Sequence, residues 1–433
     1  MKKSELRYLF VYYSVLLFIL IVMDRMEAPS IILRIAYLLS FSLPVVIICP
    51  QHFPALLITY MAIGTNHFAF TFFPYDMNYY PVLAAMGLLL VKQKAIKSTP
   101  PYCLLVFSFL IFFVDIITAV RIESVFYSFL TLILLSCYLN KFDDSQKVFF
   151  ANMLCVMALI ISYVYLTNYK NFLTDYAGPS SGLERGGWSD PNYLACTIGA
   201  GVMASLTQVL DYKKVKVYYR WLFVFTIGVS VIAMVVMASR GALLSLSLGT
   251  ISLILMSNAN KKVKVQVITC IVLFVIYLMN SSYVDLLEYR LETESGDGGN
   301  GRFDIWKFKI DAFFGEGNIL NLLFGYGYNG SLYLGGRGYW AIHNDFVALL
   351  CDYGLIGLSL FLYMLYYPIK IANSNSKMKV FALLLYLVLC CCSLEPFSAG
   401  RLPFFGYYLF ILCVAKSEMY NNSSFNHEYS TLN

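Results

Sequence analysis

The sequence predicts an all-α protein, a polytopic integral membrane helix bundle. Hydrophobic residues make up 59% of the 433 positions and charged residues only 13%, whereas a soluble domain carries about 25% charged residues. The mean hydropathy is +0.68. Apolar runs long enough to cross a bilayer recur along the whole chain, which is typical of a protein that spans the membrane many times.

The apolar runs define the expected membrane-spanning helices of a single domain, residues 1–433. Crossing roughly 30 Å of hydrocarbon takes about 20 residues, and the run at 78–91 is short for that, so we expect twelve to fourteen spans. The run at 6–23 counts as a span and not as a cleaved signal, because "DRMEAPS" after it lacks a small-residue cleavage site. The candidate spans are 6–23, 31–49, 54–73, 78–91, 102–120, 123–139, 148–166, 192–210, 221–238, 241–256, 265–280, 346–369, 379–393 and 402–415.

Lysine clusters indicate which loops face the cytoplasm. Lys and Arg concentrate in short cytoplasmic loops. If the N-terminus lies inside, every second loop is cytoplasmic, and these loops together with both termini hold most of the 31 basic residues. The net charge of +6 is explained by these lysines, so we expect no nucleic-acid partner. The loops are "KQKAIK" (92–97), "KFDDSQK" (141–147), "DYKKVKVYYR" (211–220), "NANKKVKV" (257–264) and "KIANSNSKMK" (370–379).

Two long polar segments then fall on the outer side, at 167–191 and 281–345. Loops of this length are usually functional and not mere connectors. Within the second segment, residues 303–314 alternate apolar side chains with Lys307, Lys309 and Asp311. This pattern predicts a short amphipathic helix that can lie on the membrane surface.

The 11 cysteines all fall inside apolar runs and are expected to be small buried hydrophobes. They show no C-x-x-C spacing and no pairing across an outer loop. We therefore expect neither a disulfide framework nor a zinc site, and the sequence calls for no metal and no cofactor.

Three arginines on the outer side are candidate ligands for a phosphate group. Arg240 lies in "MASRGALL", between two apolar runs with almost no loop, and Arg302 follows "GDGGNG". A guanidinium matches phosphate oxygens in pairs, and glycines let backbone N–H groups approach an anion. Arg185, in "GLERGGWSDPN", has a weaker form of the same pattern. The alternatives are a snorkelling side chain at Arg240 and arginines of flexible loops at the other two positions.

One histidine stands out among the four. His343 lies where the second outer segment meets an apolar run, directly before Asn344 and Asp345. Histidine is the side chain best matched to general base work near neutral pH. In the alternative interpretation, Asn344 or Asp345 caps the helix and His343 bonds locally.

One outer face that carries a histidine, arginines and two long loops suits a reaction on a membrane-anchored, phosphate-linked substrate. The sequence has no P-loop, no D-x-D, no H-E-x-x-H and no G-x-S-x-G. Asp115 and Asp352 are the main ionisable residues inside spans, fewer than an ion-coupled transporter usually needs.

Four short motifs resemble, in their order, the bacterial O-antigen ligase and polysaccharide polymerase family. A further segment, "DPNYLA" (190–195), is similar to one common in polymerase-like members, and the resemblance covers about 185–365. The expected span count exceeds the twelve usual for the family. The motifs are "MASRGALLSLSLG" (237–249), "GNGRFDIW" (299–306), "LLFGYGYNG" (322–330) and "HNDFVALLCDYGLIGLSLF" (343–361).

The resemblance implies a metal-independent glycosyltransferase of the bacterial inner membrane. Its substrates are glycans carried on undecaprenyl pyrophosphate at the outer face of the inner membrane. By motif, Arg240 and Arg302 match the family's pyrophosphate-binding arginines and His343 its proposed catalytic base; Arg185 is assigned by loop position. A flippase and a chain-length regulator are expected partners.

Several functions remain open at this point. A polymerase joins repeat units, whereas a ligase moves the finished chain to lipid A core or another acceptor. "DPNYLA" and the 35 tyrosines and 34 phenylalanines, which can stack on sugars, favour the polymerase. A glycan transporter or flippase is a different class. A third alternative is an acid-dependent glycosyltransferase that uses Asp24 and Glu27 of the first outer loop.

Overall fold

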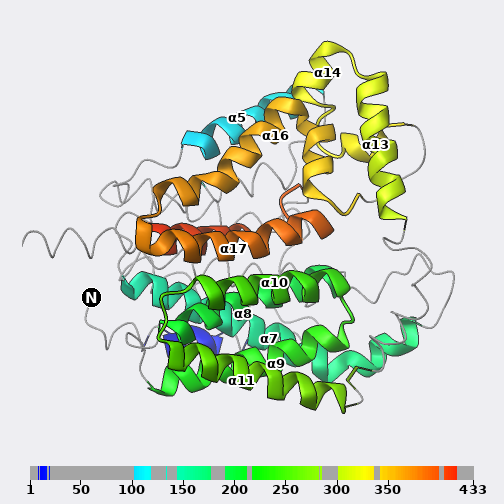
Figure 1. The fold of residues 1–433 in the computed structure, drawn as a ribbon. Coiled ribbons are helices and arrows are strands. Elements are labelled where there is room, and N and C mark those ends of the chain that lie inside the picture. The colour runs from blue at the N-terminus through cyan, green and yellow to red at the C-terminus, as the bar shows by residue number, and fades with distance from the viewer. Residues whose placement is uncertain are drawn as a thin grey trace, which may run out of the picture.

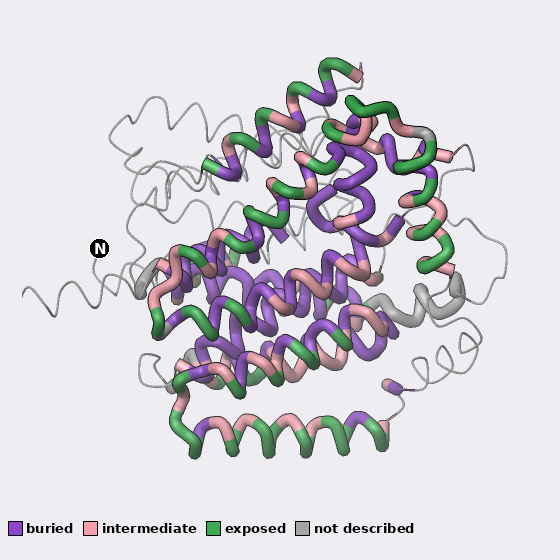
Figure 2. Tube along the Cα trace, turned by 45° about the horizontal axis from the view of Figure 1, so that its top comes forward, coloured by how far each residue is buried: buried purple, intermediate pink, exposed green. Residues whose placement is uncertain are grey.

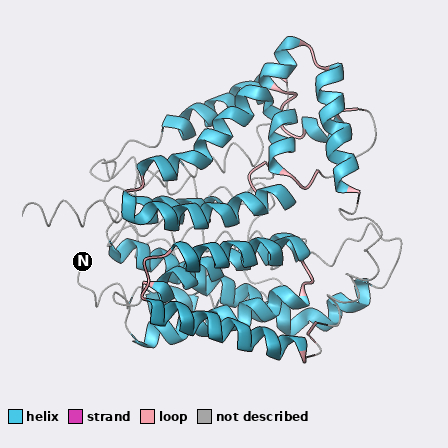
Figure 3. Ribbon diagram, viewed as in Figure 1, coloured by secondary structure: helices cyan, strands magenta, loops and turns pink. Residues whose placement is uncertain are grey.

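The computed structural model is all-α over the residues that it describes, with no strand among them (Figure 3). Among the described residues, five helices are long and apolar enough to cross a membrane, and four shorter ones are also apolar. The protein is therefore a polytopic membrane protein, as the sequence predicts. The structure describes residues 8, 10–16, 19, 102–118, 133, 144–176, 191–211, 217–281, 283–284, 301–335, 342–398 and 404–416.

Most of the expected spans between residues 102 and 416 appear as helices close to the expected positions. The expected spans at 31–49, 54–73, 78–91 and 123–139 lie outside the described residues, as does most of 6–23. The helices are α5 (Tyr102–Ile117), α7 (Asp144–Tyr176), α8 (Pro191–Leu210), α9 (Val217–Val236), α10 (Arg240–Met256), α11 (Lys261–Met279), α13 (Arg302–Glu316), α14 (Ile319–Phe324), α15 (Gly330–Tyr333), α16 (Asp345–Ile371), α17 (Ser374–Ser393) and a last helix, Phe404–Lys416.

The helices form a bundle with a second layer across it (Figure 1). In the bundle α7, α8 and α9 pack on one another, and α10 packs on α8 and α17. In the second layer α16 packs against α5, α13, α14 and α15. Helix α11 lies on the outside of the bundle, with few buried side chains (Figure 2). Its apolar exposed surface is suited to contact with lipid.

Small residues let the bundle helices approach closely. A Cβ added to Gly201 of α8 would lie 2.6 Å from the Leu154 carbonyl oxygen of α7, and one on Gly249 of α10 would lie 2.9 Å from Tyr386 Cβ of α17. Close backbone contact is the usual way in which membrane helices gain packing energy, because lipid offers no hydrophobic driving force between them.

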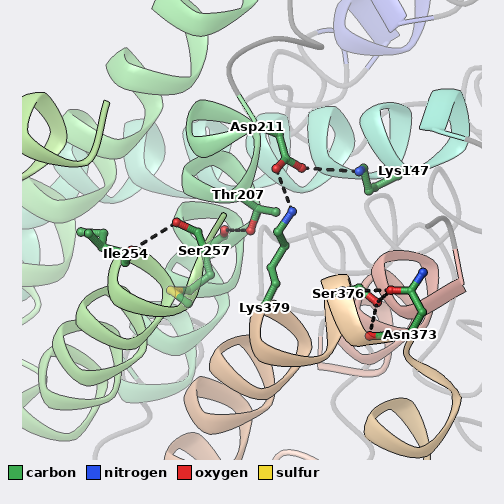
Figure 4. A network of polar contacts seen from close by, with 9 residues as sticks. Lys147, Thr207, Asp211, Ile254, Ser257, Asn373, Ser376 and Lys379 are labelled. Atoms are coloured by element: carbon green, nitrogen blue, oxygen red, sulfur yellow. Dashed lines mark hydrogen bonds and ion pairs between the residues drawn. The ribbon is translucent and has the colours of Figure 1, made fainter. Parts of the chain in front are cut away.

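A charged network joins three helices at the end of the bundle that the lysine distribution predicts to be cytoplasmic (Figure 4). Asp211, just after α8, accepts from Lys379 Nζ of α17 at 2.7 Å and from Lys147 Nζ of α7 at 3.5 Å. Both lysines are buried. Moving one helix end away would leave a buried charge without its partner, which is strongly destabilising. The network therefore fixes the relative positions of the three helix ends.

Two helices differ from their expected limits. Helix α7 continues to Tyr176, so the first part of the outer segment expected at 167–191 is helical. The span expected at 346–369 is not one continuous helix, because Gly354 has φ 68° and ψ −169° and separates α16 into two parts. Residues with these dihedrals cannot continue an α-helix, and glycine adopts them without steric cost.

The cysteines follow the expected pattern with one exception. Seven of the nine that the structure describes are buried and Cys392 is half-buried, but Cys270 on α11 is exposed. The expectation that every cysteine is buried was therefore wrong for Cys270, because an apolar run in a membrane helix can face lipid as well as protein.

Candidate functional site

The C-terminal end of α17 and the segment after it, residues 393–398, meet the predicted site residues. Arg302 Nη1 donates to the Ser393 carbonyl oxygen at 3.1 Å. Gly241, next to Arg240, lies so close to Ser393 that an added Cβ would be 3.1 Å from Ser393 Cβ. Arg302 and the residue after Arg240, far apart in the sequence, therefore both lie against Ser393.

Arg240 and Arg302 occupy equivalent positions in their helices. Each is the first residue of its helix, α10 or α13, and each helix begins without a side chain that caps its N–H groups. Ser239, at the N-cap of α10, donates its hydroxyl to Asn192 Oδ1 at 2.8 Å instead. Helix N-termini carry a partial positive charge and backbone N–H donors, so both helix starts favour an anion.

His343 lies beside the same segment in an unusual backbone conformation. Its φ is 52°, in the left-handed region, where histidine is enriched relative to most side chains. Its backbone N–H donates to Glu395 Oε1 at 2.5 Å. Glu395 thus holds the backbone of the residue that the sequence marks as a general base.

Asn344 and Asp345 fix the start of α16. Asn344 is the N-cap, and its Oδ1 accepts from the backbone N–H of Phe346 at 2.9 Å and of Val347 at 3.2 Å. Asp345 is fully buried. Its carboxylate accepts from the backbone N–H of Phe397 at 3.0 Å and of Ser398 at 2.8 Å. Both residues therefore support the helix mouth, and Asp345 ties it to the segment after α17.

Glu395 was not among the residues predicted from the sequence. Its backbone N–H donates to the Tyr193 hydroxyl at 3.3 Å, so it also links α8 to the site. Tyr193 belongs to "DPNYLA", a motif that the sequence analysis used only for family resemblance. The available signal was an acidic side chain in the short segment between the last two spans, "SLEPFSAGR".

Helix α13 is present as predicted from 303–314, with limits Arg302–Glu316, but its faces differ from the expected ones. Lys309 is fully buried, and its Nζ donates to the carbonyl oxygens of Leu332 at 3.2 Å and Leu334 at 2.7 Å. These bonds satisfy the C-terminal end of α15, whose carbonyls need donors. Phe303 and Phe314 are instead exposed.

Trp306 connects α13 to the residue that precedes the histidine. Its Nε1 donates to the carbonyl oxygen of Ile342, the residue before His343, at 2.6 Å. Arg302 and Trp306 lie one helical turn apart, so α13 contacts both the 393–398 segment and the residue that leads into the site. Arg185, Asp24 and Glu27 lie outside the described residues.

The fold defines the class of protein, a multispanning membrane protein, and these contacts bring Arg302 and the backbone of His343 to one segment at the end of α17. Residues 222–362 match the family model described as O-Antigen ligase, the family that the motifs resemble. The matched segment contains Arg240, Arg302 and His343. No curated protein matches the chain. The family match supports a role in glycan transfer during O-antigen assembly at a bacterial membrane.

Proposed function

We propose that the chain polymerises oligosaccharide repeat units carried on undecaprenyl pyrophosphate, at the outer face of the inner membrane, to form a surface polysaccharide. The observation that carries the proposal is a convergence on residues 393–395. Arg302 and His343 contact this segment, and so does Gly241, the residue after Arg240. A reaction that needs an anion clamp and a base within one site requires such a convergence.

In this proposal Arg240 and Arg302 hold the pyrophosphate of the donor. The acceptor hydroxyl oxygen attacks the anomeric carbon of the donor glycan, and a new glycosidic bond forms as the bond from that carbon to the pyrophosphate breaks. The leaving lipid pyrophosphate takes the bonding electrons. Two guanidinium groups and two uncapped helix N-termini, those of α10 and α13, stabilise the charge that develops on it.

His343 takes the proton of the attacking hydroxyl. The backbone bond to Glu395 and the Asn344 cap hold the backbone of His343 at the mouth of α16. A fixed base is effective because proton transfer needs the acceptor nitrogen within hydrogen-bond reach of the hydroxyl. In the same proposal Arg185 adds a weaker contact to the donor.

The direct test is transfer by the purified protein in proteoliposomes, supplied only with lipid-linked repeat units. A ladder of products longer than one repeat supports the polymerase. Absence of any transfer product, with the protein folded and the donor intact, would contradict the proposal and favour a transporter of the glycan.

A ligase is the second candidate, because the matching family model is described as O-Antigen ligase. The same proteoliposomes with added lipid A core distinguish the two reactions. A product in which lipid A core carries the glycan, without a ladder on the lipid carrier, would replace polymerisation by ligation and leave the roles of the arginines and the histidine unchanged.

A further inference from the structure

Helix α14 exposes an apolar surface on the side of the protein where His343 lies. Ile319 is 73% exposed and Leu320 is 63% exposed, and Phe314 at the end of α13 is also exposed. The range 319–331, "ILNLLFGYGYNGS", contains no charged residue. A contiguous apolar surface without charges is unusual for a loop in water and marks a surface that is covered by something else.

This surface lies near a second exposed apolar helix face, on α5. Helix α14 packs on α16, which also packs on α5, and α14 lies near the outer end of α5 in both views (Figures 1 and 2). A Cβ on Gly327 would lie 2.2 Å from Thr118 Oγ1, directly after α5. On α5 itself Phe113, Ile116 and Ile117 are exposed. The two exposed apolar faces therefore adjoin.

The backbone that follows α14 finds its hydrogen-bond partners inside the protein. Such satisfaction is the condition under which non-helical backbone is tolerated at membrane depth, because lipid supplies no partners. Two N–H groups donate to nearby carbonyl oxygens: Gly325 to Asn321 O (2.7 Å) and Gly330 to Gly327 O (2.8 Å). Two donate to α16 carbonyl oxygens: Tyr326 to Cys351 O (3.0 Å) and Gly327 to Asp352 O (2.8 Å). Two donate to carboxylates: Tyr328 to Asp115 Oδ1 (3.0 Å) and Ser331 to Asp352 Oδ1 (2.7 Å).

The acceptors exist because of the break in α16. Gly354 interrupts the helix, so the carbonyl oxygens of Cys351 and Asp352 accept from residues 326 and 327. A Cβ on Gly354 would lie 2.4 Å from Leu323 O, which shows how closely the two backbones pack. Asp352 lies seven residues along α16 from Asp345, which corresponds to about 10 Å along the helix axis.

We propose that residues 319–331 form a re-entrant segment that enters the leaflet on the His343 side, with the exposed face of α14 in contact with lipid acyl chains. The segment is then not part of a water-exposed loop. The occupant is lipid and not a protein partner, because the surface lacks charges and continues the exposed apolar face of α5. This inference does not depend on the proposed transfer reaction.

The test measures what surrounds α14 in the intact protein. A fluorescent, environment-sensitive amino acid replaces Ile319 or Leu320, and in a control it replaces Asp311 on the exposed, polar side of α13. These side chains are exposed, so the replacements leave the core unchanged. Each protein is placed as a single copy in nanodiscs made with or without brominated phosphatidylcholine.

We expect at least a two-fold loss of fluorescence at positions 319 and 320 in brominated lipid, together with emission shifted to the blue and little quenching by iodide. Position 311 should be quenched by iodide instead. Quenching of positions 319 and 320 by iodide to the same degree as position 311 would overturn the proposal. Protection from both quenchers would also overturn it, because a protein surface would then cover α14.

Discussion

At the scale of single residues, the backbone of His343 makes a sharp test of its role possible. Asparagine tolerates the left-handed region as histidine does, whereas alanine pays about 1 kcal/mol or more there. His343→Asn therefore preserves the φ of 52° and the bond to Glu395 but cannot accept a proton. We expect a loss of transfer of about 10²–10⁴-fold, measured as product formed per amount of folded membrane protein.

His343→Ala serves as the second variant in this experiment. It should lose activity to a similar extent and also lose some stability, because of the backbone cost. Full activity of His343→Asn would eliminate the general base role and leave a structural histidine.

Lysine should not replace either Arg240 or Arg302 without loss of transfer activity. Arg240→Lys and Arg302→Lys keep the charge but lose the planar fork that binds two phosphate oxygens at once. Each should lower the transfer rate by about 10²–10³-fold, comparable to the loss of one donor from an oxyanion site. The measurement is initial rate against donor concentration.

Arg220→Lys is the matched control for this prediction, because Arg220 is the fourth residue of α9, at the end of the bundle that the lysine distribution predicts to be cytoplasmic. It should behave as the unmodified protein. Normal rates from Arg240→Lys would return that residue to a snorkelling role at a helix end.

At the scale of the helix, the break in α16 should be sensitive to a single methyl group. Gly354→Ala places a Cβ 2.4 Å from the Leu323 carbonyl oxygen and forces a non-glycine residue to φ 68°. Such strain typically costs about 1–3 kcal/mol. We expect a lower unfolding temperature in detergent, read by loss of the monodisperse peak after heating, and reduced transfer because residues 325–331 lose their backbone partners.

Gly228→Ala in α9 controls for the effect of a methyl group in a helix. Nothing lies within 4 Å of the added Cβ, and alanine favours a helix over glycine by about 1 kcal/mol. This variant should be as stable as the parent or slightly more so. Equal behaviour of the two variants would show that the close contact at Gly354 is not important for folding.

At the scale of the whole molecule, the distribution of lysines predicts which ends of the bundle face outward. Cysteine introduced at Ser295 should react with a membrane-impermeant maleimide added to intact cells stripped of their outer envelope. Cysteine at Lys261, the first residue of α11, should react only after the inner membrane is permeabilised. We expect this orientation because Lys and Arg concentrate in cytoplasmic loops, and because a loop with many positive charges is not readily carried across the lipid.

Both labels are compared with the parent protein, which contains the exposed Cys270. Reaction of position 295 only from the cytoplasmic side would show that the topology is the reverse of the predicted one. The site at residues 393–398 would then face the cytoplasm, and transfer at the outer face would be ruled out.

The sequence alone determined the class of protein, the limits of most described helices and the family that the chain resembles. These properties are local: an apolar run of sufficient length has few alternatives to a helix in lipid, and short motifs keep their order without reference to packing. Arg240, Arg302, His343, Asn344 and Asp345 were proposed in this way, from short motifs at the ends of apolar runs and after a glycine-rich loop.

Only the tertiary structure decided which helix ends meet. Glu395 belongs to the candidate site because its carboxylate contacts His343, 52 positions earlier in the chain. Lys309 is buried because its ammonium group binds the carbonyl oxygens at the end of α15. The break at Gly354 depends on residues 323–327 packing against it. Such contacts join segments that are distant in the chain, and hydrophobic periodicity carries no information about which partners they choose.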